Sequence, residues 1–158
     1  MKSNEDIEAY LLQMGRDFFS PQGGVWIIHD EYDDVENIVV VNAPPVVTFR
    51  VKIMDLPDMH REGLFEQLLR LNANEMIAGA YGIEQEAIVI VDTLQAENLD
   101  FNEFEAAIDG LSMAIAMHFP KLRAFVGDPE PSASHPVVSA DAQAELAEFG
   151  AKLDEEMA

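Results

Sequence analysis

The chain has 158 residues, of which 30 are acidic and 9 are basic, so its formal net charge at pH 7 is −21. A chain of this charge is repelled by phosphate backbones and by anionic membrane surfaces, so we expect it to bind neither nucleic acid nor such a membrane. Two interpretations of the charge remain open. It is either a self-repelling surface that keeps the chain soluble, or a means of attracting a basic partner.

The sequence contains no cysteine. This excludes disulfides, thiolate metal sites and a cysteine nucleophile, and it is compatible with a reducing cytoplasm. The first residues show no basic region followed by an apolar run, so we expect no secretory signal. No apolar run approaches the roughly 18 residues of a membrane span, and we therefore expect no membrane insertion.

The N-terminal pattern predicts a helix over residues 3–19. Ser3 is a suitable N-cap, with Asp6 three residues later. Apolar residues recur on one helical face, namely Ile7, Leu11, Met14 and Phe18. Pro21 and the glycines that follow it are expected to end this helix.

Three strands are predicted next, at residues 25–29, 37–41 and 46–53. An acidic turn at 30–34 separates the first two, and Pro44-Pro45 separates the second from the third. Strands that are joined by such short breaks form an antiparallel meander.

The third of these strands alternates between apolar and basic side chains. Phe49, Val51 and Ile53 fall on one side, and Arg50 and Lys52 fall on the other. This pattern is typical of a strand with one face on a core and the other in water.

A second helix is predicted after Asp58, which is a plausible N-cap. Its leucines form one stripe, made of Leu64, Leu68 and Leu71. Phe65 and Leu69 widen the apolar surface beyond what contact with a single sheet requires.

The second helix is followed by two strands, at 80–83 and 87–91, and by a third helix. Asp100 and Glu103 have the spacing of a capping box at the start of that helix. Pro120 is expected to end or kink it.

Strands and helices are thus segregated along the chain, in the order α-β-β-β-α-β-β-α. This order predicts an α+β fold with an antiparallel sheet. We expect one domain over residues 1–126. A Pro-rich linker and an acidic segment of helical propensity follow at 127–158, and this tail is a candidate cover for an apolar groove.

No constellation of catalytic residues is evident, and we expect neither a cofactor nor a metal. A calcium loop from Asp92 to Glu103 lacks the required ligands and glycine at its interior positions, so Glu103 is better explained as the cap partner of Asp100. No two of the four histidines are close in sequence, and no nucleophile elbow or phosphate loop is present. A small-molecule enzyme is the least favoured class.

The remaining possibility is that the protein binds a partner through its surface, because wide apolar stripes and sheet edges can accept one. Leu64, Leu68 and Leu71 are our candidates for a dimer contact, although the same stripe could equally be the core of the domain. The candidate residues for a partner-binding groove lie in the first two strands, and they are Trp26, Ile28, Val39 and Val41.

The middle of the chain resembles two related families, the class I type III secretion chaperones of the CesT/Tir type and the YbjN-type bacterial proteins. The resemblance is carried by a helix end at 68–72, a turn and strand at 79–84, the strand at 87–91, and the helix at 104–115 with Leu99-Asp100 before it. Pro44-Pro45-Val46 and the strand at 46–53 are similar to the YbjN-type pattern. In element order the resemblance covers roughly residues 7–125.

This resemblance implies a secretion-chaperone-like fold. It also implies a small, acidic, cytoplasmic homodimer that binds an extended segment of a secreted protein without enzymatic activity. The alternative that it implies is a YbjN-type regulatory or sensory domain with no role in secretion.

Overall fold

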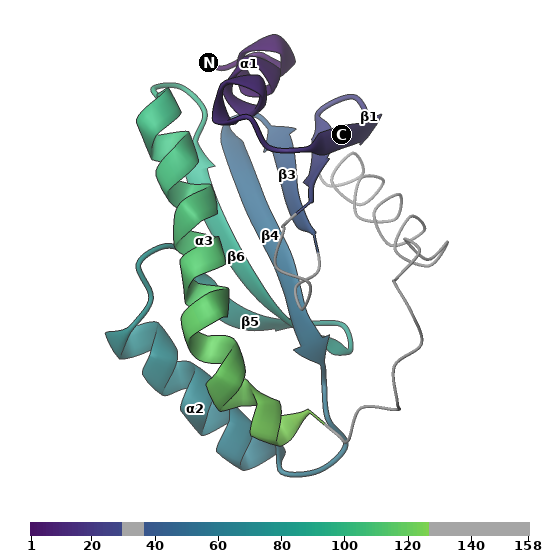
Figure 1. Cartoon of the computed structure of the whole chain (residues 1–158), viewed down its shortest axis with the longest axis vertical. Coiled ribbons are helices and arrows are strands. Elements are labelled where there is room, and N and C mark those ends of the chain that lie inside the picture. The colour runs from purple at the N-terminus through teal and green to yellow at the C-terminus, as the bar shows by residue number, and fades with distance from the viewer. Residues whose placement is uncertain (30–36, 127–158) are drawn as a thin grey trace. The chain divides into compact units, whose positions relative to one another are not determined.

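The computed structural model describes residues 1–29 and 37–126. The predicted acidic turn at 30–34 and the linker and tail at 127–158 lie outside these residues. Six strands form one sheet in the order β1-β2-β3-β4-β6-β5, and every neighbouring pair is antiparallel. Figure 1 shows α3 crossing the sheet over β4 and β6, with α1 at one end and α2 at the other. The predicted α+β class and the predicted succession of elements are confirmed.

The structure adds one strand that the sequence pattern did not predict. Helix α1 spans Asn4–Met14, with Ser3 and Asp6 forming the expected capping box, and Gly15 ends it in the left-handed conformation at φ 68°. Strand β1 follows over Phe18–Gln22 and pairs with β2, Val25–Ile28. The predicted helix over 3–19 was therefore too long. The left-handed conformation at Gly15 favours a helix end, and it stops α1 before Pro21 is reached.

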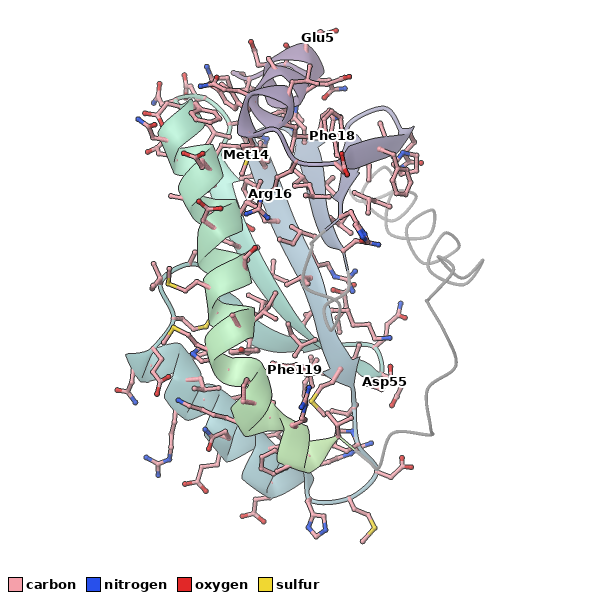
Figure 2. The ribbon with its side chains drawn as sticks, viewed as in Figure 1. Glu5, Met14, Arg16, Phe18, Asp55 and Phe119 are labelled. Atoms are coloured by element: carbon pink, nitrogen blue, oxygen red, sulfur yellow. The ribbon has the colours of Figure 1, made fainter. Side chains whose placement is uncertain are left out.

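The junction between α1 and β1 is fixed to α3 by an ion pair. The Arg16 guanidinium lies 2.9 Å from the Asp109 carboxylate on α3. Figure 2 shows the side chains of Met14, Arg16 and Phe18 close together at this junction.

Strands β3, Ile38–Ala43, and β4, Val46–Asp55, continue the meander. The alternation in β4 holds at Phe49 and Val51, which are buried, but a register shift between β4 and β6 falls at 52–54. After this bulge, Met54 rather than Ile53 is buried. A bulge adds one residue to a strand and so exchanges the two faces.

Helix α2 spans Arg61–Asn74. Its N-cap position is His60, at φ 60°, and no side chain caps the helix. The prediction that Asp58 caps α2 was therefore wrong.

Strands β5, Ala80–Glu84, and β6, Ala87–Gln95, form a hairpin, and β6 also pairs with β4. Gly79 precedes β5 at φ 67°, where a Cβ atom would meet the Val91 carbonyl oxygen at 2.7 Å. Only glycine fits such a close approach without strain.

Helix α3 spans Phe101–Leu122 and supplies most of the helical part of the core. Asp100 and Glu103 form the predicted capping box. The helix continues two residues past Pro120, and a short 3₁₀ turn, Arg123–Phe125, follows it. In the described parts of the chain, no helix has the length and apolar character needed to cross a membrane.

Candidate partner-binding surfaces

The three leucines predicted at a dimer contact lie in the core of their own chain. Leu64, Leu68 and Leu71 are 0, 5 and 2% exposed, and they belong to the cluster that joins the helices to the sheet. Their inward orientation accounts for the folding of α2 against β5 and α3. Their role in a dimer contact stays a prediction, since the structure describes a single chain.

The opposite face of α2 carries the surplus apolar surface that Phe65 and Leu69 indicated in the sequence. Leu69 is 68% exposed, Ala73 is exposed and Phe65 is half-buried. These side chains recur every four residues and so lie on one helical face. An open hollow of about 680 Å³ runs along this face, and its lining consists of Glu62, Phe65, Glu66, Leu69, Arg70, Ala73 and Asn74. We call these seven residues the outer face of α2.

Charges of both signs border this apolar row. The Arg70 guanidinium lies 2.8 Å from the Glu66 carboxylate one helical turn away, and both side chains are largely exposed. Exposed pairs of this kind contribute little to stability, about 0.3–0.5 kcal/mol. The outer face therefore presents an apolar centre flanked by an acidic and a basic group.

The end of α2 is fastened to strand β5 by the amide of Asn72. Its oxygen accepts a hydrogen bond from the Tyr81 N–H at 2.7 Å, and its nitrogen donates one to the Tyr81 carbonyl at 3.2 Å. β5 is an edge strand, so these two backbone groups point away from β6. Asn72 thus occupies the free backbone groups of the sheet edge at Tyr81 and anchors the end of α2 to β5, while the leucines of α2 face the core.

The structure does not place the four predicted groove residues on one surface. Trp26 and Ile28 are buried in the cluster beneath the helices, where their partners in register on β3 are Val40 and Ile38. Val39 and Val41 alternate with those partners, and so they lie on the other face of the sheet. No single groove is formed by all four, and contact of any of them with a partner stays a prediction.

The other face of the sheet combines aliphatic and basic side chains. Val25, Ile27 and Val41 are largely buried there but lie outside the helix-side cluster. On β4 the Arg50 guanidinium pairs with Glu84 at 2.7 Å, and the Lys52 ammonium pairs with Asp55 at 2.9 Å. Both basic groups are thus engaged in ion pairs within the chain.

Two further groups of apolar side chains reach the surface. Leu12 on α1 and Phe19 on β1 are exposed at one end of the molecule. Ile77, Met113 and Met117 are exposed on the loop after α2 and on α3. Single exposed apolar residues are common in soluble proteins, so neither group defines a site by itself.

The described residues offer no metal centre. Within 1–29 and 37–126, no cluster of three or more histidine, aspartate or glutamate side chains has the arrangement needed to hold a metal ion. Glu103, once a candidate calcium ligand, bonds to the backbone N–H of Asp100.

Comparisons with known proteins agree with this architecture. Residues 1–128 match the model of the CesT_Tir_1 family. Among curated proteins, no sequence gives a significant match.

Two solved structures share the fold. The crystal structure of YbjN from E. coli, a protein proposed to regulate transcription, matches with a TM-score of 0.63 and 13% identity, over 78% of this chain and 93% of that one. A chain of the heterodimeric ExoU–SpcU complex, from the type III secretion system of Pseudomonas aeruginosa, matches with a TM-score of 0.59 and 16% identity, over 72% of this chain and 95% of that one.

At such identities the likeness to the two structures concerns the fold alone. The family assignment comes from the sequence match, which spans the whole described part of the chain. It confirms the resemblance drawn from the residue pattern. The chain belongs to the CesT_Tir_1 family.

Proposed function

We propose that this chain is a non-enzymatic binding protein, a homodimer that holds an extended segment of a protein partner in the manner of a type III secretion chaperone. The observation that carries the proposal is the outer face of α2. A small, acidic chain of this family exposes Leu69 and Ala73 there, beside Phe65, which is half-buried against the core. An exposed apolar face of this kind, bordered by polar groups, is typical of a protein interaction site.

The outer face is suited to a second copy because its pattern is self-complementary. In a two-fold interface the same patch contacts itself in reverse order. A two-fold axis near residues 67–68, with antiparallel helices, brings Phe65 close to the partner's Leu69. It also brings Glu66 close to the partner's Arg70. The apolar groups and the charges are then both matched.

The oligomeric state tests this arrangement. Leu69→Glu places charge at the centre of the outer face, where the side chain is solvent-exposed in one chain, so the fold is preserved and the dimer is lost. Leu12→Glu is the matched control, because Leu12 is 66% exposed on α1. Light scattering coupled to size exclusion should give twice the 17.5 kDa chain mass for the wild type and for the control. The Leu69→Glu variant should elute as a monomer. A monomeric wild type contradicts the proposal.

The alternative function is regulatory, and the structural likeness to YbjN favours it. Affinity capture from the native cell with mass spectrometry separates the two functions. A secreted partner that is bound through an unfolded segment, as judged by its protease sensitivity in the complex, supports the chaperone. A folded intracellular regulator supports the alternative.

A further inference from the structure

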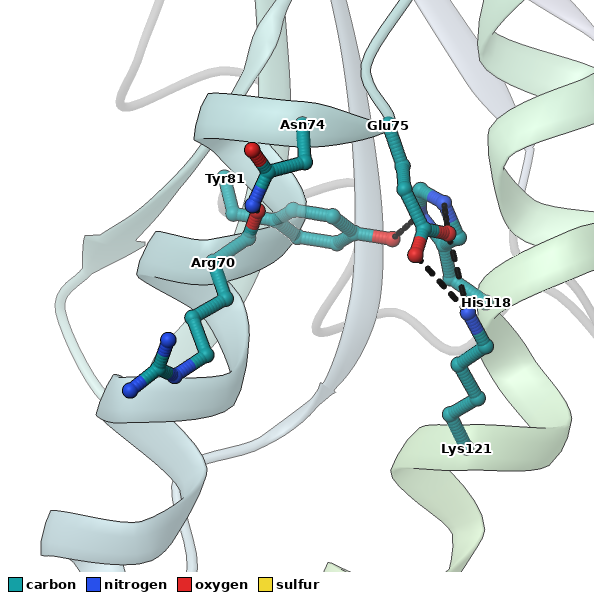
Figure 3. A network of polar contacts seen from close by, with 6 residues as sticks. All are labelled: Arg70, Asn74, Glu75, Tyr81, His118 and Lys121. Atoms are coloured by element: carbon teal, nitrogen blue, oxygen red, sulfur yellow. Dashed lines mark hydrogen bonds and ion pairs between the residues drawn. The ribbon is translucent and has the colours of Figure 1, made fainter.

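A buried histidine joins three elements at the end of α2. His118 on α3 is fully buried, and it is the one polar side chain in the core of the described residues. The Tyr81 hydroxyl on β5 lies 2.9 Å from its Nδ1, and the Glu75 carboxylate, at the C-cap of α2, lies 3.3 Å from its Nε2. Figure 3 shows these side chains converging between α2 and α3.

The neighbours of His118 determine where its ring proton lies. The Glu75 carboxylate can only accept, so the proton of a neutral imidazole belongs on Nε2, which faces it. Nδ1 then accepts a hydrogen bond from the Tyr81 O–H. The contact between Nε2 and Glu75 is long and poorly aligned for a hydrogen bond, so the carboxylate compensates only in part for burial of the ring.

The Lys121 ammonium is the other charged group at this junction, and it is directed toward Glu75. It lies 3.1 and 2.9 Å from the two carboxylate oxygens. Glu75 is therefore shared between Lys121 and His118.

We propose that Glu75, Tyr81 and His118 form a pH-sensitive latch, which fastens the end of α2 and strand β5 to α3 and loosens when His118 takes up a second proton. Protonated Nδ1 becomes a donor, so the Tyr81 O–H can no longer donate to it and its hydrogen must turn away for the oxygen to accept instead. The resulting imidazolium is buried, and Lys121 competes with it for Glu75. This latch is independent of the proposed dimer and of any partner.

Among Glu75, Tyr81 and His118, the histidine is the group expected to change its protonation. Burial lowers the pKa of His118 from its ordinary value of 6.5; Glu75 opposes this shift and Lys121 adds to it. The bond to Lys121 keeps the pKa of Glu75 below its usual range, and burial raises the pKa of Tyr81, so the carboxylate stays charged and the hydroxyl stays protonated.

The sign of the pH effect follows from the direction of the His118 shift. Because the pKa of the folded state lies below 6.5, the unfolded chain binds the proton more readily. The latch therefore contributes its full stability above pH 6.5 and loses it as the pH falls from 6.5 through the pKa of the folded state.

Movement at the latch would reach both α2 and β5. The loop between them packs tightly on α3, where a Cβ atom on Gly110 would come within 2.7 Å of the Ala78 Cβ. Asn72, one turn before the latch, fastens α2 to the same tyrosine. Acidification should therefore increase amide hydrogen exchange in residues 72–83 more than in β3 or β4.

The test compares thermal unfolding of the full chain at about pH 7.5 and about pH 5.5, on either side of the ordinary histidine pKa. His118→Gln keeps a neutral acceptor for Tyr81 and a neutral donor toward Glu75, but it cannot titrate. The wild type should lose a few degrees of Tm on acidification relative to this variant. The control is His60→Asn, which removes an exposed histidine at a positive φ that asparagine tolerates, and it should behave as the wild type. Equal pH dependence in the wild type and His118→Gln overturns the latch.

A second measurement tests the latch even if His118→Gln fails to fold. In the wild type, NMR titration of the imidazole resonances should place the pKa of His118 below 6.5, and Glu75→Gln should lower it further because the favourable carboxylate is gone. A His118 ring that titrates at or above 6.5, or is unaffected by Glu75→Gln, overturns the proposal.

Discussion

Helices α2 and α3 use their apolar residues in different ways. α3 has 22 residues, a capping box and nine buried positions, so it is anchored in the core along its length. α2 has 14 residues, no side-chain cap and three buried leucines, and it carries a second apolar row on its outer face. A helix with two apolar faces holds its own domain with one of them and leaves the other available. This difference, rather than total hydrophobicity, makes α3 a core helix and the outer face of α2 the candidate interface.

The largest effect should come from charging the inner face of α2. Leu68→Glu places a carboxylate in the core, where no partner compensates for its desolvation, and we expect a loss of about 4 kcal/mol or more in the free energy of unfolding. Urea titration followed by circular dichroism measures it. Leu12→Glu, at an exposed position, should stay within about 0.5 kcal/mol of the wild type. Near-wild-type stability of Leu68→Glu would mean that the inner stripe is not core.

A cavity next to α3 should lower the free energy of unfolding by the same amount at every protein concentration. Leu111 is fully buried, so Leu111→Ala should remove about 2–5 kcal/mol from the free energy of unfolding. Leu69→Ala on the outer face of α2 should cost much less, and its cost should vary with protein concentration because it acts on association. The contrast between α2 and α3 is contradicted if both variants lose the same free energy of unfolding at every protein concentration.

Removing the residues near the N-termini of α3 and α2 should change the free energy of unfolding by smaller amounts. Asp100→Ala removes the acceptor that lies 2.8 Å from the Glu103 N–H, and it should destabilise the chain by about 0.5–2 kcal/mol. Asp58→Ala should change stability by less than about 0.5 kcal/mol, since α2 begins at Arg61 without a side-chain cap. Equal effects of these two substitutions in urea titration would remove this contrast between the helices.

The sequence was sufficient to predict the fold class because most elements have strong local signals. The capping boxes at Ser3 and Asp100, and the alternation around Phe49, all agree with the structure. β1 was missed because Phe18 continues the helical spacing of α1, and the stop at Gly15 depends on a left-handed conformation that periodicity does not reveal.

The candidate surfaces could not be predicted in the same way, because they depend on contacts between different elements of the fold. Which apolar row of α2 faces inward depends on tertiary contacts, among them the packing of its leucines in the core and the hydrogen bonds between Asn72 and Tyr81. The division of Trp26 and Val39 between two sheet faces follows from the pairing register. Glu75, Tyr81 and His118 meet only through the tertiary fold, so no spacing in the sequence could have indicated them.

The most direct test of the account is a cross-link at the outer face of α2. The chain has no cysteine, so Leu69→Cys introduces a single thiol at an exposed position. A short bismaleimide cross-linker can bridge position 69 and its copy across the proposed two-fold axis, so it should link this variant efficiently into a covalent dimer, whereas Leu12→Cys, similarly exposed on α1, should remain largely unlinked. Equal cross-linking of the two variants, or none at position 69, would contradict the assignment of the outer face of α2 to a second copy.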